Sequence, residues 1–135
     1  MKNFTNKRYY SVVVSTSPRA MSPIPFFEKQ VGDVISVTAV ATMKKDEKVI
    51  IYVSTGKMQD GGIYGLGTIV SDRYSDSNTS KKLIDIQLDY VCTEENPLLT
   101  YDEICPSILG QVVRPQYIRH EIPTVEKLFA DKGLI

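Results

Sequence analysis

Two tyrosines in neighbouring apolar stretches are the residues whose types and spacing point most directly to chemistry. Tyr52 lies within residues 48–56, and Tyr64 lies within residues 61–71, a stretch that also carries glycines at positions 62, 65 and 67. Both stretches are rich in β-branched and aromatic residues, which is typical of strands. Two aromatic strands around a turn of small residues can form a slot for a flat ring. We therefore expect Tyr52 and Tyr64 to face one cavity that Gly62 keeps open.

The glycine cluster also has the composition of a phosphate loop, but its order argues against one. A dinucleotide fingerprint needs Gly-x-Gly-x-x-Gly between a strand and a helix, whereas Gly62-x-x-Gly65-x-Gly67 has the reverse spacing and continues into a strand-like segment. The string Gly62-Ile-Tyr-Gly65 matches a GXXG clamp, yet that clamp joins helices. Two alternatives remain. Glycines at the start of a hairpin permit a bulge or a close backbone approach, or they leave space for a flat ligand beside Tyr64.

Few residues have the spacing that catalysis or metal binding requires. His120 is the only histidine, and no serine, cysteine or acid accompanies it at a spacing typical of a triad. Cys92 and Cys105 lack the C-x-x-C spacing of a zinc site. The adjacent acids at 94–95 and 102–103 are more simply a turn and a helix start. The sequence therefore predicts a non-enzymatic domain with no catalytic residue, no metal and no cofactor.

The segment from Arg114 to His120, Arg-Pro-Gln-Tyr-Ile-Arg-His, concentrates positive charge around one aromatic ring. It is either a solvated loop or a local contact for a phosphate backbone, because such contacts position a nucleic acid. Catalysis is a third alternative, and it would require His120 to share one pocket with Asp85 and Asp89.

The composition of the chain limits the classes of function that it can have. The 135 residues, 42% of them hydrophobic, are typical of one globular domain spanning residues 1–135. No apolar run reaches the roughly 18 residues of a membrane span, and the N-terminus lacks the apolar core of a signal peptide, so we expect no membrane contact and a cytoplasmic location. The 16 basic residues balance 16 acidic ones. This neutrality favours a short nucleic-acid footprint, a local basic patch, recognition of a single base or nucleotide, or no nucleic-acid role.

The elements that must position these residues are mostly strands. Strand patterns cover residues 9–15, 49–54, 63–72 and 83–92, and residues 33–43 are a strand or an extended segment. Residues 73–82 have the composition of a solvated loop. The uneven strand spacing, without a βαβ rhythm, predicts a mixed or mostly antiparallel curved sheet or small barrel.

Three helical segments are expected beside this sheet. Residues 98–109 hold a short helical turn that Thr100 can cap. Pro25 can begin a short helix whose apolar face holds Phe26, Phe27 and Val31. Thr124 can cap a C-terminal helix that Gly133 ends.

The order of these pieces resembles the EVE domain family within the PUA-like superfold. The resembling pieces are Tyr9-Tyr-Ser-Val-Val-Val-Ser15, the polar turn and strand from Met43 to Ser54, and the glycine-rich strand and acidic turn from Gly62 to Tyr74. Later pieces follow in a similar order, so the resemblance covers most of residues 8–134. It implies an α+β fold, a PUA-like curved mixed β-barrel of five to six strands with short peripheral helices.

Members similar to EVE and YTH domains bind nucleic acid and hold a modified base in a pocket of aromatic and small polar residues. The resemblance implies a flipped base stacked on a ring. Because the chain has no tryptophan, the ring would be Tyr52, Tyr64 or Phe27. The candidate ligand-binding residues are Ser15, Thr16, Ser17, Val37, Thr38, Tyr52, Ser54, Gly62, Ile63 and Tyr64, and the residues that would meet the nucleic-acid backbone are Arg114, Arg119 and His120.

We therefore expect a non-enzymatic binding domain that recognises a modified base or nucleotide in DNA or RNA. The alternative is a small-molecule or protein-interaction module that uses the same cleft without nucleic-acid binding, and the neutral net charge favours it. The choice between DNA and RNA, the base modification and the oligomeric state stay open at this point.

Overall fold

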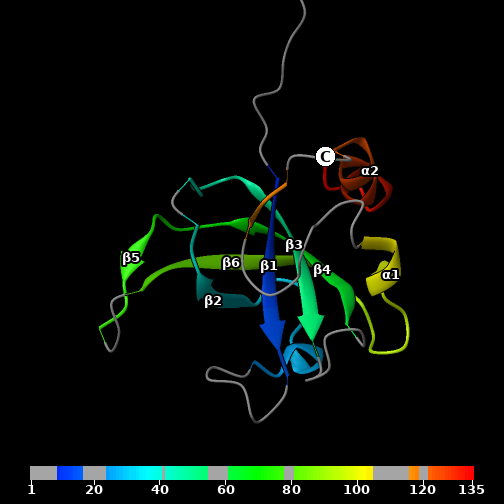
Figure 1. Ribbon diagram of the computed structural model, residues 1–135, viewed down its shortest axis with the longest axis horizontal. Helices are drawn as coiled ribbons and strands as arrows, with labels where there is room; N and C mark the ends of the chain where they lie inside the picture. The colour runs from blue at the N-terminus through cyan, green and yellow to red at the C-terminus, as the bar shows by residue number, and fades with distance from the viewer. Residues whose placement is uncertain are drawn as a thin grey trace, which may run out of the picture.

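The computed structural model describes residues 9–16, 24–40, 42–54, 61–77, 81–104, 116–118 and 122–135. They form a mixed sheet with a 3₁₀ turn and two helices beside it (Figure 1). The longer strands are β1 (Tyr9–Ser15), β2 (Val34–Thr38), β3 (Lys48–Ser54), β4 (Gly62–Ile69) and β6 (Lys82–Val91), and the two-residue strands are β5 (Tyr74–Ser75), β7 (Leu99–Thr100) and β8 (Gln116–Tyr117). The helical elements are η1 (Phe26–Glu28), α1 (Tyr101–Ile104) and α2 (Ile122–Asp131).

The sheet is strongly curled. Its strands follow the order β2-β6-β4-β3-β1-β8, while β5 pairs with β6 and β7 pairs with β4. The β1–β3 pair is parallel, and the others are antiparallel. Although β6, β4 and β3 separate β1 from β2 in this order, Cα atoms of β1 and β2 come within 8 Å of each other. The five longer strands thus form the curved, mixed, PUA-like barrel that the sequence predicts.

Each face of the curled sheet buries its own core. The barrel core lies on the concave face and includes Phe26, Ile51 and Tyr64. The helix-side core lies on the opposite face, where α1 and α2 pack (Figure 1), and includes Tyr52 and Phe129. Because side chains alternate across a strand, β3 sends its odd-numbered apolar residues into the barrel core and its even-numbered ones under the helices. This double burial explains its nearly continuous apolar sequence.

The minor elements depart from the sequence prediction. The helix expected after Pro25 is the three-residue η1, and Val31 is 63% exposed instead of buried. Tyr74 and Ser75, predicted to lie in a loop, form β5. The C-terminal helix begins at Ile122, so Thr124 lies within it and is not its cap. Gly133 does end this helix, with a φ of 71° and the Leu134 N–H donating to the Phe129 carbonyl. None of the helices in the described ranges is both long and apolar enough to cross a membrane.

Candidate functional site

Tyr52 and Tyr64 lie on opposite faces of the sheet, so the expected shared slot is wrong. Tyr52 is fully buried in the helix-side core, whereas Tyr64 lies in the barrel core with 8% of its surface exposed. The cause is an irregularity in the β3–β4 register: Ile51 pairs with Gly65 and Tyr52 pairs with Ile63, which leaves Tyr64 as an extra residue. A regular ladder would have placed the two tyrosines opposite each other on one face. The bulge turns Tyr64 into the barrel.

Gly62 does not keep a cavity open beside the tyrosines, as the sequence suggested. A Cβ at Gly62 would lie 2.6 Å from the Leu99 carbonyl oxygen, because β7 pairs closely with this end of β4. Two other glycines make room for rings: a Cβ at Gly61 would lie 2.5 Å from Cζ of Tyr52, and a Cβ at Gly65 would lie 2.6 Å from Cζ of Phe26. Both rings belong to the protein itself. Gly62 therefore permits the close approach of another backbone, which is one of the two alternatives that the sequence left open for these glycines.

Three aromatic side chains gather beside the end of the barrel, and we call Phe26, Phe27 and Tyr64 the aromatic cluster. The Phe27 and Tyr64 ring centroids are 4.9 Å apart with an interplanar angle of 86°, and those of Phe26 and Phe27 are 5.9 Å apart at 85°. Such edge-to-face contacts are favourable for aromatic rings. The Ile24 N–H donates to the Ser15 carbonyl at 2.8 Å, which ties the segment before η1 to the end of β1. The bulge on β4 and the position of η1 together create the cluster.

Acidic residues lie near the tyrosine of the cluster. The Cys92 N–H donates to the Tyr64 carbonyl at 2.8 Å, and this contact brings the turn after β6 alongside Tyr64. Burial is the largest cause that raises the pKa of Tyr64, followed by the charges of Glu94, Cys92 and Glu95. The phenol therefore remains a neutral hydrogen-bond donor across the physiological range. The two nearby glutamates disfavour a phosphate at this position.

Three of the small polar candidates lie together at the ends of β1 and β3. Ser15 pairs with Ser54 in the parallel ladder, and the Thr16 N–H donates to the Ser54 carbonyl at 3.0 Å. The Thr16 hydroxyl donates to the same carbonyl at 3.4 Å. The preceding residues Val14 and Val53 belong to the barrel core, as Tyr64 does. The structure thus brings Ser15, Thr16 and Ser54 to the end of the barrel where η1 attaches.

The other candidate ligand-binding residues that the structure describes lie on different faces of the sheet. Val37 is buried in the barrel core together with Tyr64, while its neighbour Thr38 is exposed. Ile63 is fully buried in the helix-side core with Tyr52. Ser17, Arg114, Arg119 and His120 lie outside the described residues, so their assigned roles stay predictions.

Comparison with known proteins finds solved structures whose fold is similar to that of this chain. No protein-family model matches this chain, and no curated protein matches it significantly. The crystal structure of the human THYN1 protein in complex with DNA containing 5-methylcytosine is 16% identical, has a TM-score of 0.59, and the match covers 90% of this chain and 97% of that one. The DUF55 domain of human thymocyte nuclear protein 1 is 12% identical, with a TM-score of 0.57 over 94% and 99% of the two chains. A hypothetical protein from Leishmania major is 16% identical, with a TM-score of 0.56 over 95% and 98%.

These likenesses extend over nearly the whole chain and agree with the curled, mixed sheet. The chain has a PUA-like fold. The PUA-like domain shares this fold with structures to which it has 12 to 16% sequence identity, so the arrangement of its strands, and not any one motif, carries the likeness.

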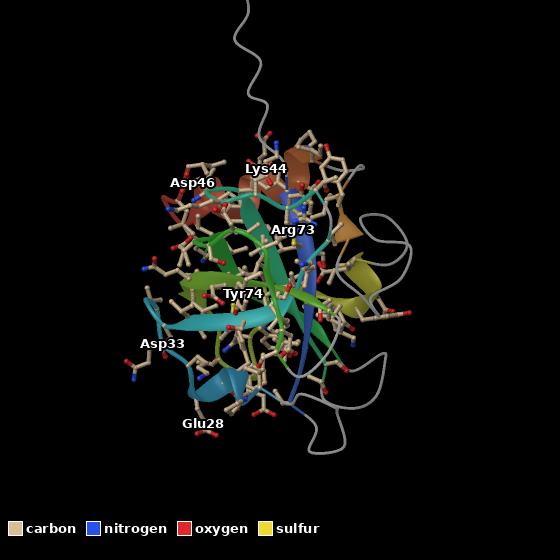
Figure 2. The ribbon with its side chains drawn as sticks, turned by 90° about the vertical axis from the view of Figure 1, so that its left-hand side faces the viewer. Glu28, Asp33, Lys44, Asp46, Arg73 and Tyr74 are labelled. Atoms are coloured by element: carbon tan, nitrogen blue, oxygen red, sulfur yellow. The ribbon has the colours of Figure 1, made fainter. Side chains whose placement is uncertain are left out.

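A polar cluster on the outer face of the PUA-like domain was missed by sequence reasoning. The Tyr74 hydroxyl donates to Oδ1 of Asp85 at 2.6 Å, and the Ser36 hydroxyl donates to the same oxygen at 2.7 Å. The hydrogen bond to Asp85 is the largest cause that raises the pKa of Tyr74. Figure 2 looks onto this face and shows Tyr74 near Arg73. The available signal was the alternation of β6, which predicts that Asp85 points away from the barrel core.

Asp89, the second acid of the catalytic alternative, lies on the same strand but has a different partner. It accepts a hydrogen bond from the Thr68 hydroxyl, which in turn accepts one from Nζ of Lys48 at 2.9 Å. In the part of the PUA-like domain that the structure describes, no group of three His, Cys, Asp or Glu residues could hold a metal ion.

Proposed function

We propose that this PUA-like domain binds nucleic acid and holds one base, preferentially a modified one, against its aromatic cluster. The observation that carries the proposal is the perpendicular pair of Phe27 and Tyr64 rings, 4.9 Å apart, beside the end of the barrel. Phe27 is partly exposed and Tyr64 is 8% exposed, so a base can stack on Phe27 and contact the small exposed part of Tyr64. Stacking of this kind supplies about 1–3 kcal/mol per base. The likeness of fold to a protein solved with 5-methylcytosine-containing DNA supports this class of ligand.

The charge around the aromatic cluster supports contact with a base and not with a phosphate. Burial is the largest cause that raises the pKa of Tyr64, and the charges of Glu94 and Glu95 are further causes. The Tyr64 phenol therefore lies near two carboxylates. Carboxylates accept hydrogen bonds from the exocyclic amino groups of cytosine and adenine but repel phosphate. We therefore assign the phosphate contacts to the basic segment with Arg114, Arg119 and His120. A net charge of zero agrees with a footprint of a few phosphates.

A binding role without catalysis is part of the proposal. Tyr64 and Cys92 are two nucleophile candidates near the cluster, and burial raises the pKa of both side chains. An activated nucleophile needs the opposite shift, because the deprotonated form attacks. The chemistry of this site therefore supports holding a ligand.

The test is to measure the affinity of the wild type and of single variants for short fluorescent oligonucleotides, with and without 5-methylcytosine, as DNA and as RNA. Tyr64→Ala and Phe27→Ala should each weaken binding about 5- to 150-fold, the equivalent of about 1–3 kcal/mol of stacking. Tyr74→Ala is the matched control, because Tyr74 is exposed on the outer face, outside the cluster. Circular dichroism and thermal unfolding establish that each variant is folded. Equal affinity of the wild type, Tyr64→Ala and Phe27→Ala would refute the site.

Binding of a free small molecule at the same cluster is the second candidate. The neutral net charge and the two glutamates beside Tyr64 favour it, since neither attracts a polyanion. Free 5-methylcytidine separates the two functions. If Tyr64→Ala abolishes binding of the nucleoside while oligonucleotides bind no more tightly than the nucleoside, the domain is a small-molecule binder.

A further inference from the structure

Tyr117 is an aromatic residue that belongs to neither the barrel core nor the helix-side core. Its surface is 37% exposed, and it lies on β8, the short strand at one end of the strand order. In the sequence it stands in the middle of residues 114–120, which include two arginines and a histidine and no acid. An exposed aromatic residue within a basic segment has the composition of a surface on which a nucleic-acid base stacks.

The backbone of β8 determines where the Tyr117 ring points. In the antiparallel β1–β8 pair, Tyr117 lies opposite Tyr10. The next residue, Ile118, donates its N–H to the Tyr9 carbonyl at 2.9 Å, and its side chain is fully buried in the helix-side core. Because side chains alternate across a strand, Tyr117 faces the barrel side, as Tyr10 does. The exposed ring therefore has a defined orientation.

The Tyr117 ring is supported from the inside. Its centroid lies 5.4 Å from that of the Tyr10 ring, at an interplanar angle of 48°. Tyr10 is fully buried, and its hydroxyl donates to the Thr42 carbonyl at 2.9 Å. A side chain that already packs against a fixed ring loses little conformational entropy when a ligand stacks on its exposed side. Tyr117 is thus a preorganised platform for stacking.

β1 relates this platform to the aromatic cluster. Figure 1 shows β8, in orange, beside the start of β1, whereas η1 lies beyond the end of β1. The segment from Tyr10 to Ser15 spans about 16 Å at the usual rise of a strand. A DNA strand advances about 3.4 Å per stacked nucleotide and roughly twice as far when it is extended, so this span corresponds to about two to five nucleotides.

We propose that Tyr117 stacks a second base of the nucleic-acid strand whose modified base the aromatic cluster holds, about two to five nucleotides away. This inference rests on the proposed function and adds a second contact to it. Tyr117 accepts any base, because every base has a π face. The basic segment around Tyr117 in the sequence is suited to the phosphates at this end of the footprint. The domain then selects one base at the aromatic cluster and holds the strand at Tyr117.

Tyr117→Trp tests the second contact, because the chain has no tryptophan of its own. Its emission should be quenched on binding of a DNA strand of about eleven nucleotides with 5-methylcytosine at the centre. A trinucleotide with the same central base is too short to span about 16 Å and should leave the emission unchanged. The matched control is Tyr74→Trp, since Tyr74 is 38% exposed on the outer face, and neither strand should quench it.

The affinities for the two strands give a second measurement. Tyr117→Ala should weaken binding of the longer strand about 5- to 150-fold and change the affinity for the trinucleotide by less than about twofold. Unchanged emission of Tyr117→Trp at saturation with the longer strand overturns the second contact. An equal loss of affinity for both strands in Tyr117→Ala overturns it as well.

Tyr64→Ala separates this inference from the proposed function, because it should weaken both strands. If it does so while Tyr117→Trp stays unquenched, the second contact is wrong and the aromatic cluster stands. If Tyr64→Ala binds both strands as the wild type does, the proposed site fails, whatever the emission of Tyr117→Trp shows. A wild type that binds neither strand overturns both.

Discussion

Gly65→Ala tests the packing that creates the aromatic cluster. A Cβ at residue 65 would lie 2.6 Å from Cζ of Phe26 and 3.3 Å from Cδ1 of Ile51. An ordinary contact begins at 3.4 Å, so the Phe26 ring would have to move by roughly 0.8 Å, from 2.6 to 3.4 Å. Phe26 is fully buried and packs against Phe27, which in turn packs against Tyr64. Overpacking of this kind costs about 1–3 kcal/mol of the free energy of unfolding, which urea denaturation measures.

A double-mutant cycle separates the clash with Phe26 from a general effect of alanine in β4. Phe26→Leu shortens the side chain that the new Cβ meets, so the double variant with Gly65→Ala should be less destabilised than the sum of the two single variants. Gly67→Ala is the control, because its Cβ would meet Ile86 and the Gln87 carbonyl instead of Phe26. Phe26→Leu should not relieve it. A Gly65→Ala variant within about 0.5 kcal/mol of the wild type would refute the packing argument.

Three further predictions follow from single residues. Burial and the neighbouring Glu126 raise the pKa of Tyr9 from 10.0 to about 12, so its protonated form stabilises the fold fully below pH 10, and this stabilisation is lost as the pH rises from 10 to 12. Tyr9→Phe should therefore show a smaller loss of stability than the wild type over this interval, and equal pH profiles would contradict the assignment. Tyr52→Ala should lower the free energy of unfolding by about 3–5 kcal/mol and leave the affinity of the folded protein for oligonucleotides unchanged, and a selective loss of affinity would return Tyr52 to the binding site. Arg114→Ala and Arg119→Ala should each reduce the slope of log affinity against log salt by about one, and an unaltered slope would place the phosphates elsewhere.

The fold was predictable because its strands carry strong local patterns. The sequence predicts β1, β3 and β6 to within one or two residues, since β-branched residues and the alternation around Ile84, Ile86 and Leu88 are local signals. The short elements were less predictable. β5 depends on pairing between Tyr74 and Leu83, which no local pattern reports.

The candidate site was predictable only in part, because its geometry depends on one bulge. A regular β3–β4 ladder puts Tyr52 and Tyr64 on one face, and the register shift at Ile51 and Tyr52 separates them. Nothing in the glycine spacing tells which glycine accommodates a neighbouring backbone and which accommodates a ring. The proximity of Phe27 to Tyr64 likewise depends on where η1 attaches to the end of β1, which no local pattern reports.

Titration of the isotope-labelled protein with a short DNA strand containing one 5-methylcytosine, followed by nuclear magnetic resonance, tests the central claim most directly. We expect the largest shifts at the aromatic resonances of Phe27 and Tyr64 and at the amides of Thr16 and Ser54, because a base stacked on the aromatic cluster changes their ring-current environment. The Tyr74 resonances on the outer face should stay unchanged. Shifts confined to the outer face around Tyr74, with Phe27 and Tyr64 unaffected at saturation, would contradict the claim that the aromatic cluster holds the base.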